Sequence, residues 1–534
     1  MGAESSPVRG AFLFLAVLIA AFSVQAYSQR WYNDDTFITF RYSRNLVEGA
    51  GIAWNTVDGV PVEGSTSLGW MLLAALGMVV GLDPVGFTHF LGILAGAAAM
   101  VVSWRVARDR LGLSPLRALA APLVLALGRQ WLVWAVAGLE TRAATLLVLV
   151  ATARLALEIE DPGRRAWISG LLFFLATVFR PEVPLLHLAA GAGLAVAAGG
   201  RDSLKRIALS GLVHGAWLLG LCGWRMALFG KPLPNTFYAK VGGVQLSLGL
   251  TYVGQFLAQN FAWIWLPLIV AGVWWARRRL PLLVPALLAQ ALFWTTWVAV
   301  EGGGAWEFRF FDMLLPGLAL LAAFSLDRLA PAEAGRRRLF AVGAWVVAAA
   351  FAVPTFRPFQ EFFPTVSWRS LKHSADEMLR EGRLLAPYLG PTDRICIGWA
   401  GALPWVTGAW HFDPFGLNDP EIATRPFQKQ SVLFHQRHAT WDDVVRRRVM
   451  FCDIFNQFLY DRPYAPNQVP RSLMPWARDG VMVHCLELPI RERWRYWIFA
   501  SPAPVSEVRA WAGRKGLKVH YSAPLIVSRP GVRR

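Results

Sequence analysis

The chain has 534 residues, of which 55% are hydrophobic and 16% charged, and its mean hydropathy is +0.39. This composition argues against a string of ordinary soluble domains and predicts an integral protein of a lipid bilayer. The net charge is +18, but the excess of basic residues falls in short clusters between apolar runs, which is typical of membrane topology and disfavours nucleic-acid binding. No CxxC spacing occurs, so neither a disulfide framework nor a structural zinc site is predicted from the cysteines, which are Cys222, Cys396, Cys452 and Cys485.

The first apolar run, residues 11–27, is long enough for a slightly short membrane span. We expect an uncleaved anchor, because the most informative stretch of the chain begins directly after this run. Arg9 precedes the run and no Lys or Arg interrupts it, which predicts an N-terminus in the cytoplasm. Further apolar runs occupy residues 68–82, 86–106, 115–137, 141–157, 166–180, 183–199, 206–228, 255–276, 280–299, 307–327 and 338–356.

The basic loops decide how many of these runs cross the membrane. If residues 68–82 formed a full span, every basic loop would lie outside, against the positive-inside rule. That run is only about 15 residues long, so we interpret it as an interfacial or re-entrant helix, which leaves about eleven spans. The loops then placed in the cytoplasm are 105–117, 158–165, 201–206, 277–279 and 336–338.

This topology predicts two domains: a transmembrane domain over residues 1–357 and a soluble domain over residues 358–534, outside the bacterial cytoplasmic membrane. The second part is richer in charge and contains turn dipeptides and alternating apolar stretches such as 394–399 and 480–486, which predict an α/β fold. No tandem repeat is visible.

The outer loop 28–66 contains the sequence Asn33-Asp34-Asp35 followed by an amphipathic helix expected at the membrane interface. These three residues suit the start of that helix as capping groups, and the capping and catalytic interpretations stay open. Adjacent carboxylates project about 100° apart on a helix, so one of them acts as a base unless a metal or a kinked turn gathers both. A divalent cation at Asp34 and Asp35 is therefore a possible cofactor, and none is certain.

Other polar residues also fall on loops of the predicted outer face. Singly, each is more typical of interfacial anchoring or helix capping, but together they indicate a site on one membrane face. They are Glu63, Glu140, Arg180, Glu182, Asn235, Tyr238, Lys240, Glu307 and Arg309.

The motifs of this face resemble those of the multi-spanning GT-C glycosyltransferases. Among them the chain is most similar to the terminal β-(1→2)-arabinofuranosyltransferases of mycobacterial cell walls and their bacterial relatives. The motifs are residues 33–42, 62–64, 138–141, 180–182, 233–240 and 416–420.

The resemblance implies transfer of a sugar from a polyprenyl-phosphate donor to an acceptor outside the cytoplasm, with an Asp of the first outer loop as the essential carboxylate. By position that residue is Asp34 or Asp35, and a carboxylate can accept the proton of an attacking hydroxyl. Departing phosphate needs positive charge, which Lys240, Arg309 or Arg41 could supply. The remaining polar residues of the outer face are expected to bind substrate. The acceptor would be an envelope polysaccharide, lipopolysaccharide or glycoprotein.

The chain departs from the family in Glu301-Gly302-Gly303-Gly304-Ala305-Trp306, where a Gly-Gly-Asp-Trp-like pattern is expected. One alternative function is a transporter or flippase of lipid-linked glycans. Transporters place ionisable residues near the membrane midplane in repeated halves, whereas here such residues collect at one face, which favours an enzyme. The other alternative is a non-catalytic envelope or motility factor with the same fold.

Overall fold

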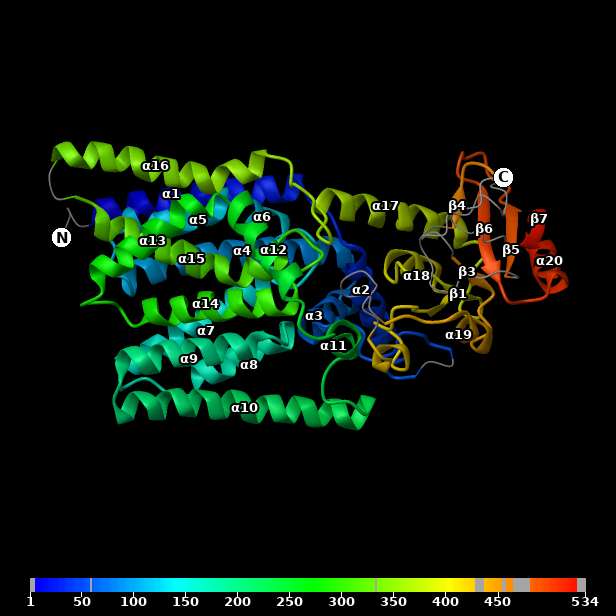
Figure 1. Cartoon of the computed structure of the whole chain (residues 1–534), viewed down its shortest axis with the longest axis horizontal. Helices are drawn as coiled ribbons and strands as arrows, with labels where there is room; N and C mark the ends of the chain where they lie inside the picture. Colours follow the sequence, from blue (N-terminus) through cyan, green and yellow to red (C-terminus); the bar gives the residue numbers. More distant parts are fainter. Residues whose placement is uncertain are drawn as a thin grey trace.

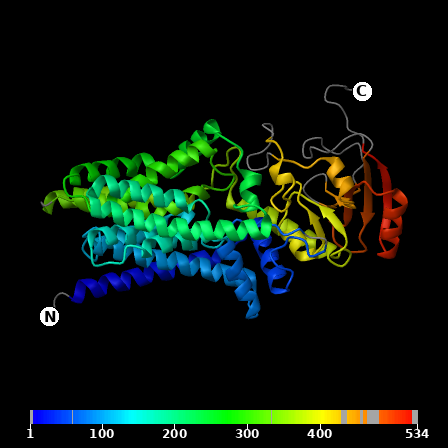
Figure 2. The same ribbon diagram turned by 90° about the horizontal axis from the view of Figure 1, so that it is seen from below.

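The computed structural model describes residues 5–57, 60–331, 334–427, 437–453, 458–463 and 481–525. It has two parts lying end to end, a helical bundle at the left of Figure 1 and a domain built on a β-sheet at the right. Between them lie the helices α2 (Asp34–Val47), α3 (Leu68–Val79) and α11 (Asn235–Lys240). Figure 2 shows the same division in a view turned by 90°, with the N-terminus at the far end of the bundle.

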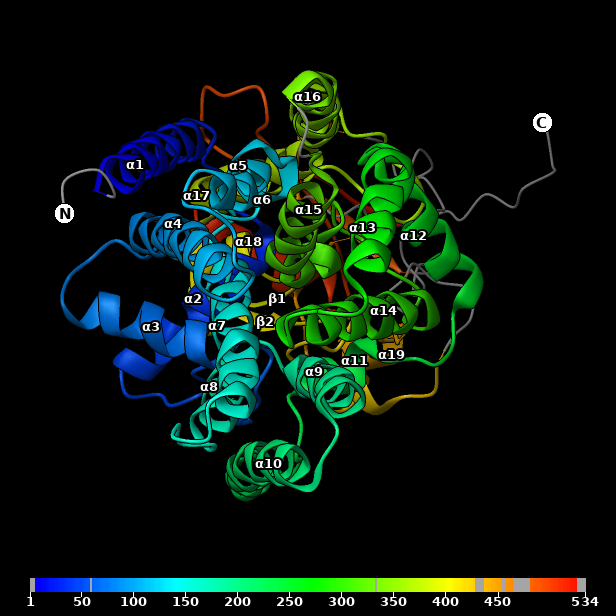
Figure 3. The same ribbon diagram turned by 90° about the vertical axis from the view of Figure 1, so that its left-hand side faces the viewer.

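The helical bundle contains a set of long helices and several short ones. Viewed from its end in Figure 3, α10 and α16 lie at the periphery of the bundle. The elements are α1 (Ser5–Ser28), α4 (Pro84–Asp109), η1 (Arg117–Leu119), α5 (Ala120–Leu127), α6 (Arg129–Val133), α7 (Thr141–Glu160), α8 (Ile168–Phe179), α9 (Val183–Ala198), α10 (Arg201–Phe229), α12 (Leu246–Gln259), α13 (Ala262–Ala276), α14 (Leu283–Glu301), η2 (Arg309–Leu314), α15 (Leu315–Leu329) and α16 (Ala334–Phe356).

Within the described residues, five helices are long and apolar enough to cross a membrane, or six if the bent pair α12 and α13 forms one span. The chain is therefore a polytopic helical membrane protein, as the composition predicts, and the number of about eleven crossings stays a prediction. The five are Val8–Ser28, Pro84–Asp109, Arg201–Phe229, Leu283–Glu301 and Arg309–Leu329.

Two of the runs predicted as spans are not single helices, and whether they cross the membrane stays a prediction. The run 115–137 breaks at Gly128, whose ψ of 124° is extended, and the helix restarts at Arg129. The run 255–276 is interrupted after Asn260, and α12 and α13 meet at 88°. At that break Phe261 adopts the left-handed region with φ of 52°. A hydropathy pattern does not register such backbone breaks, because both arms remain apolar.

The predicted interfacial segment forms α3, which has 12 residues and begins where the Ser67 side chain accepts a hydrogen bond from the Trp70 backbone N. Such a helix is about 18 Å long, shorter than a hydrocarbon core of about 30 Å. Its length thus agrees with the interpretation, and its place relative to the membrane stays a prediction.

The second domain combines helices with a mixed sheet. Its sheet runs in the order β2-β1-β3-β6-β5-β7, with β4 also paired to β6; β1 pairs with β2 and β3 in parallel, and the other pairs are antiparallel. The predicted strands appear at β1 and β5, and Gly480 of the second lies outside the described residues. The elements are α17 (Trp368–Leu385), β1 (Arg394–Cys396), α18 (Ala402–Thr407), β2 (Trp410–Phe412), η3 (Ile422–Thr424), α19 (Trp441–Arg446), β3 (Phe451–Cys452), β4 (Leu459–Tyr460), β5 (Met482–Glu487), β6 (Tyr496–Ser501), α20 (Val505–Arg514) and β7 (Lys518–Pro524).

Two buried polar pairs lie among the apolar helices. Arg142 at the start of α7 is 2.7 Å from Asp312 of η2, and both side chains are fully buried. His187 of α9 and His214 of α10 approach through their Nδ1 atoms at 2.7 Å. The histidine pair departs from the predicted collection of ionisable residues at one face.

Candidate functional site

The start of α2 gives three consecutive polar residues different surroundings. Asn33 is the N-cap, because its side chain accepts a hydrogen bond from the backbone N of Asp35 at 3.3 Å. The capping role that the sequence left open therefore falls to Asn33. The two carboxylates that follow project in different directions from the helix.

The second domain covers Asp34 and shields its side chain from solvent. Its side chain accepts hydrogen bonds from the backbone N of Gly401 at 2.8 Å and of Ala402 at 2.7 Å, and the residue is 2% exposed. Gly401 is required there, since a Cβ at this position would lie 1.9 Å from the Asp34 carbonyl oxygen. Burial raises the pKa of Asp34 to about 7. Asp34 thus links two parts of the fold and does not face open space.

Asp35, by contrast, faces a cavity. Its side chain is 28% exposed, and one carboxylate oxygen lies 3.9 Å from the Lys240 Nζ. The cavity has a volume of about 70 Å³ and is also lined by Ser65, Thr66 and Glu140. A carboxylate in this position can accept a proton from a hydroxyl group that enters the cavity.

Three cationic side chains line the same cavity: Arg180, Lys240 and Arg309. Glu140 holds two of them, accepting from Arg309 at 2.7 Å and from Arg180 at 3.2 Å. Although burial opposes it, this pair of guanidinium groups keeps the pKa of Glu140 below its ordinary value. The Trp306 ring lies 5.0 Å from the Arg309 guanidinium and 5.6 Å from the Lys240 Nζ, within cation–π range.

A larger cavity of about 410 Å³ adjoins the small one and shares these three cations with it. Thr66, Thr236 and Trp306 also line both. Most of its remaining lining is apolar and includes Leu185, Leu233, Phe237, Val241, Trp297 and Phe310. We call the two cavities together the cleft. A ligand with an anionic group between an apolar chain and a polar head matches this arrangement.

Arg41 and Glu63, which the sequence indicated as candidates, do not line the cleft. The buried Arg41 guanidinium donates to the backbone oxygens of Trp54, Pro404 and Ala409 at 2.8–2.9 Å. Glu63 forms a buried bidentate ion pair with Arg225 of α10 at 2.7 and 2.9 Å, although its backbone adjoins Gly64 in the small cavity. Both side chains hold the outer loop in place.

Three further candidates are also engaged elsewhere. Asn235 donates to two backbone oxygens of the second domain, and the ring of Tyr238 lies 4.9 Å from the Lys231 Nζ. Glu307 is fully buried, pairs with Arg129 and accepts from the Trp368 backbone N at 2.9 Å. Of the predicted set, the structure brings six together in the cleft: Asp35, Glu140, Arg180, Glu182, Lys240 and Arg309.

Sequence reasoning missed the hydroxyl groups of the cleft. Ser65, Thr66 and Ser67 precede α3, and Ser67 caps it. Ser65 and Thr66 line the small cavity, and Thr66 donates to Thr236 at 3.0 Å. Their position directly after residues 62–64, a motif that resembles the GT-C glycosyltransferases, was the only available signal.

Asp34 and Asp35, the residues considered for a divalent cation, are not arranged to bind one. The Asp34 carboxylate points to backbone amides and the Asp35 carboxylate toward an ammonium group, so the two do not converge. Among the described residues, no group of three or more His, Cys, Asp or Glu side chains is arranged to hold a metal ion.

The fold is that of the GT-C glycosyltransferases. ArnT from Cupriavidus metallidurans bound to undecaprenyl phosphate is 12% identical, with a TM-score of 0.55 over 92% of this chain and 97% of ArnT. AglB from Archaeoglobus fulgidus, in complex with an inhibitory peptide and a dolichol-phosphate, is 12% identical, with a TM-score of 0.51 over 92% of this chain and 75% of AglB.

The arabinofuranosyltransferase AftD from mycobacteria is 16% identical, with a TM-score of 0.50 over 92% of this chain, which spans 40% of the length of AftD. These identities establish likeness of fold alone. Residues 369–501 match a family model described as a domain of unknown function (DUF8728). A search of curated proteins with the sequence found no match.

Proposed function

We propose that the chain is a glycosyltransferase that moves a sugar, with arabinofuranose favoured, from a polyprenyl-phosphate donor to an envelope glycan, lipid or protein on the outer face of the cytoplasmic membrane. The observation that carries the proposal is the cleft itself. It sets Asp35 in the same small polar cavity as Arg180, Lys240 and Arg309, and the three cations also border a larger apolar cavity.

The reaction is a single displacement with inversion. The acceptor oxygen attacks the anomeric carbon, its proton passes to Asp35, and the bond between that carbon and the phosphate oxygen breaks. Polyprenyl phosphate leaves with the electron pair. Lys240 and Arg309 stabilise the negative charge that grows on it, because charged donors in a partly dry site interact strongly with phosphate. No step requires a metal ion.

The larger cavity receives the first part of the polyprenyl chain. Its volume of about 410 Å³ lies within the range of about 300–1,000 Å³ common for pockets that bind small ligands. Support comes from two proteins of the same fold, ArnT bound to undecaprenyl phosphate and AglB in complex with a dolichol-phosphate. The preference for arabinofuranose rests on the outer-loop motifs and on the likeness to AftD.

The test is an assay of the purified full chain in phospholipid vesicles with a polyprenyl-phosphoryl arabinofuranose radiolabelled in the sugar and an octyl arabinofuranosyl disaccharide as acceptor. We expect wild type to form labelled glycan and release polyprenyl phosphate. Asp35→Asn should lower the rate at least about 100-fold, since it removes proton acceptance. Asp34→Asn is the matched control and should lose far less. Donor that crosses the vesicle membrane without any product would instead support the transporter.

A further inference from the structure

We propose that Leu417 of the second domain determines which acceptors reach Asp35. This inference rests on the proposed function. Among the described residues after 357, Leu417 is the one residue that lines either cavity of the cleft, and it lines the smaller one together with Asp35. It belongs to the motif Gly416-Leu417-Asn418-Asp419-Pro420, whose role the transfer reaction leaves unexplained.

A first set of contacts ties this motif to α2. Asp413 accepts from the backbone N of Asn418 at 2.8 Å and from its side-chain amide at 3.1 Å. The Asn418 side-chain oxygen in turn accepts from the Tyr42 hydroxyl at 3.0 Å, and that hydroxyl accepts from the Gly64 backbone N at 3.0 Å. Gly64 permits this approach, since a Cβ there would lie 2.1 Å from the Asn418 oxygen.

A second contact fixes the backbone of Leu417 itself. The Asn235 side-chain amide of α11 donates to the carbonyl oxygens of Gly416 at 2.8 Å and Leu417 at 2.9 Å. Gly416 has a φ of +77°, and a Cβ at this position would lie 2.6 Å from the Ala423 backbone N. The conformation thus requires glycine directly before Leu417.

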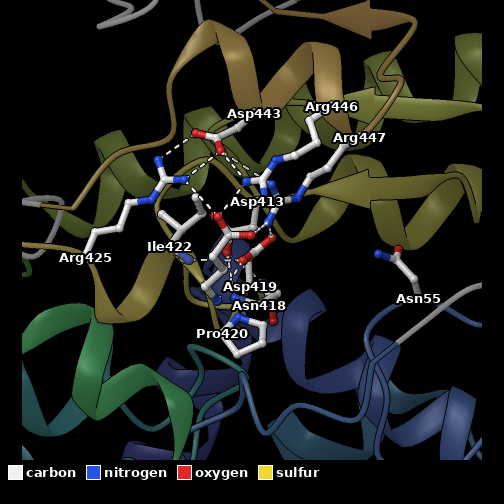
Figure 4. A network of polar contacts seen from close by, with 12 residues as sticks. Asn55, Asp413, Asn418, Asp419, Pro420, Ile422, Arg425, Asp443, Arg446 and Arg447 are labelled. Carbon is white, nitrogen blue, oxygen red and sulfur yellow. Dashed lines mark hydrogen bonds and ion pairs between the residues drawn. The ribbon is translucent and has the colours of Figure 1, made fainter.

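Ion pairs hold the side of the loop that faces away from the cleft, where Arg425, Arg446 and Arg447 gather around Asp443 and Asp419 (Figure 4). Arg447 donates to Asp419 at 2.8 Å, and Arg425 lies 2.6 Å from Asp443. Asp419 also accepts from the Ile422 backbone N at 3.1 Å. The polar atoms of the motif are thus engaged in holding the loop that places Leu417 at the small cavity.

Leu417 borders the proposed acceptor site and not the proposed donor site. The polyprenyl chain lies in the larger cavity, which Leu417 does not line, whereas the acceptor must bring a hydroxyl to Asp35 in the smaller one. With Ile38 and Leu139, Leu417 bounds that smaller cavity by apolar surface. It therefore limits the substituents beside the attacking hydroxyl, and removing its isobutyl group enlarges the space for the acceptor alone.

The experiment measures kcat/KM of the full chain for two octyl arabinofuranosyl disaccharides, one unsubstituted and one O-methylated beside the attacking hydroxyl. Leu417→Ala should raise the relative kcat/KM for the methylated acceptor by about tenfold, because one methylene in an apolar pocket is worth about that much. The donor KM should stay unchanged. Leu389→Ala is the matched control, since Leu389 is 5% exposed against 6% for Leu417 and lines neither cavity.

The outcomes separate the two proposals. If wild type transfers to neither disaccharide and releases no polyprenyl phosphate, the proposed function fails. If wild type transfers and Leu417→Ala keeps the wild-type ratio, or shifts the donor KM instead, the function stands and the role of Leu417 is overturned. Leu417→Met, which conserves volume, should restore the wild-type ratio.

Discussion

Adjacent residues of one helix can differ more in environment than residues far apart, and Asp34 and Asp35 illustrate it. The Asp34 carboxylate is satisfied by two backbone amides at 2.7 and 2.8 Å, and the Asp35 carboxylate faces a cavity and an ammonium group. The sequence predicted that one of the pair carries the chemistry. It could not say which, because the partners of Asp34 are 367 and 368 positions away in the chain.

The first prediction concerns the three cationic side chains of the cleft, Arg180, Lys240 and Arg309. Lys240→Gln removes a charge that borders both cavities, so polyprenyl phosphate should bind about 10-fold to 100-fold more weakly, the equivalent of about 1.5 to 3 kcal/mol. Titration of the purified protein with undecaprenyl phosphate, followed by native mass spectrometry, measures this. Lys231→Gln changes a lysine that precedes α11 and lines neither cavity, and equal weakening in both variants would argue against a phosphate site at Lys240.

The second prediction concerns pH. Burial raises the pKa of Asp34 from 3.8 to about 7, so between these values the folded chain binds a proton that the unfolded chain does not. The resulting stabilisation is complete below pH 3.8 and is lost as the pH rises through about 7. Asn cannot titrate. The melting temperature of Asp34→Asn, measured relative to that of wild type, should therefore increase as the pH rises from 5 to 8.

Thermal unfolding followed by tryptophan fluorescence measures this difference. Burial also raises the pKa of Asp413, to about 6. The melting temperature of Asp413→Asn relative to wild type should therefore increase over a lower pH range. Parallel melting profiles for wild type and Asp34→Asn would show that Asp34 does not titrate in this range.

At the scale of elements, α2 contacts α18 of the second domain where the two parts of the molecule meet (Figure 1). Asp34 accepts from the backbone at the start of α18, while Arg41 and Arg44 donate to the carbonyl oxygens of Pro404 and Trp405 within it. The negative charge thus lies at the N-terminus of α18 and the positive charges lie further towards its C-terminus, which complements the dipole of this helix. The contacts fix the helix that also carries Asp35.

Arg41→Ala should destabilise this junction. It removes charge-assisted hydrogen bonds to three buried carbonyl oxygens, each worth about 1.5 to 3 kcal/mol, so we expect a loss of at least about 3 kcal/mol in the free energy of unfolding. Limited proteolysis in vesicles should then release the second domain faster. Arg44→Ala removes one such bond, to Trp405 at 3.1 Å, and should have a smaller effect; the reverse order would contradict this account.

Helices were easier to predict than their breaks. The apolar runs marked nearly every element of the bundle, because burial in lipid or in a core demands the same residues. The interruptions at Gly128 and Phe261 depend on backbone conformation and were missed. Of the site, the loops that contribute were predictable from their motifs, whereas the structural roles of Arg41 and Asn235 were not, since both bind the second domain.

For the whole molecule, the orientation in the membrane follows from the basic loops. Reporter fusions after Arg117, Arg165, Arg279 and Arg338 should report the cytoplasm, and fusions after Trp54 and Phe363 the outer side. The outer loop and the second domain should share a side in any case, since Trp54 donates to His411 at 3.1 Å. A cytoplasmic signal after Phe363 would refute the predicted topology.

The central claim is that Asp35 serves sugar transfer onto an envelope component. Mass spectrometry of envelope glycans tests it directly, in a deletion strain that carries the wild-type gene, Asp35→Asn, Asp34→Asn or an empty vector. We expect the empty-vector and Asp35→Asn strains to lack the same terminal sugar, a pentose if arabinofuranose is the substrate, and the other two strains to retain it. Identical glycans in all four strains, with wild type and the two variants present at equal level, would contradict the account.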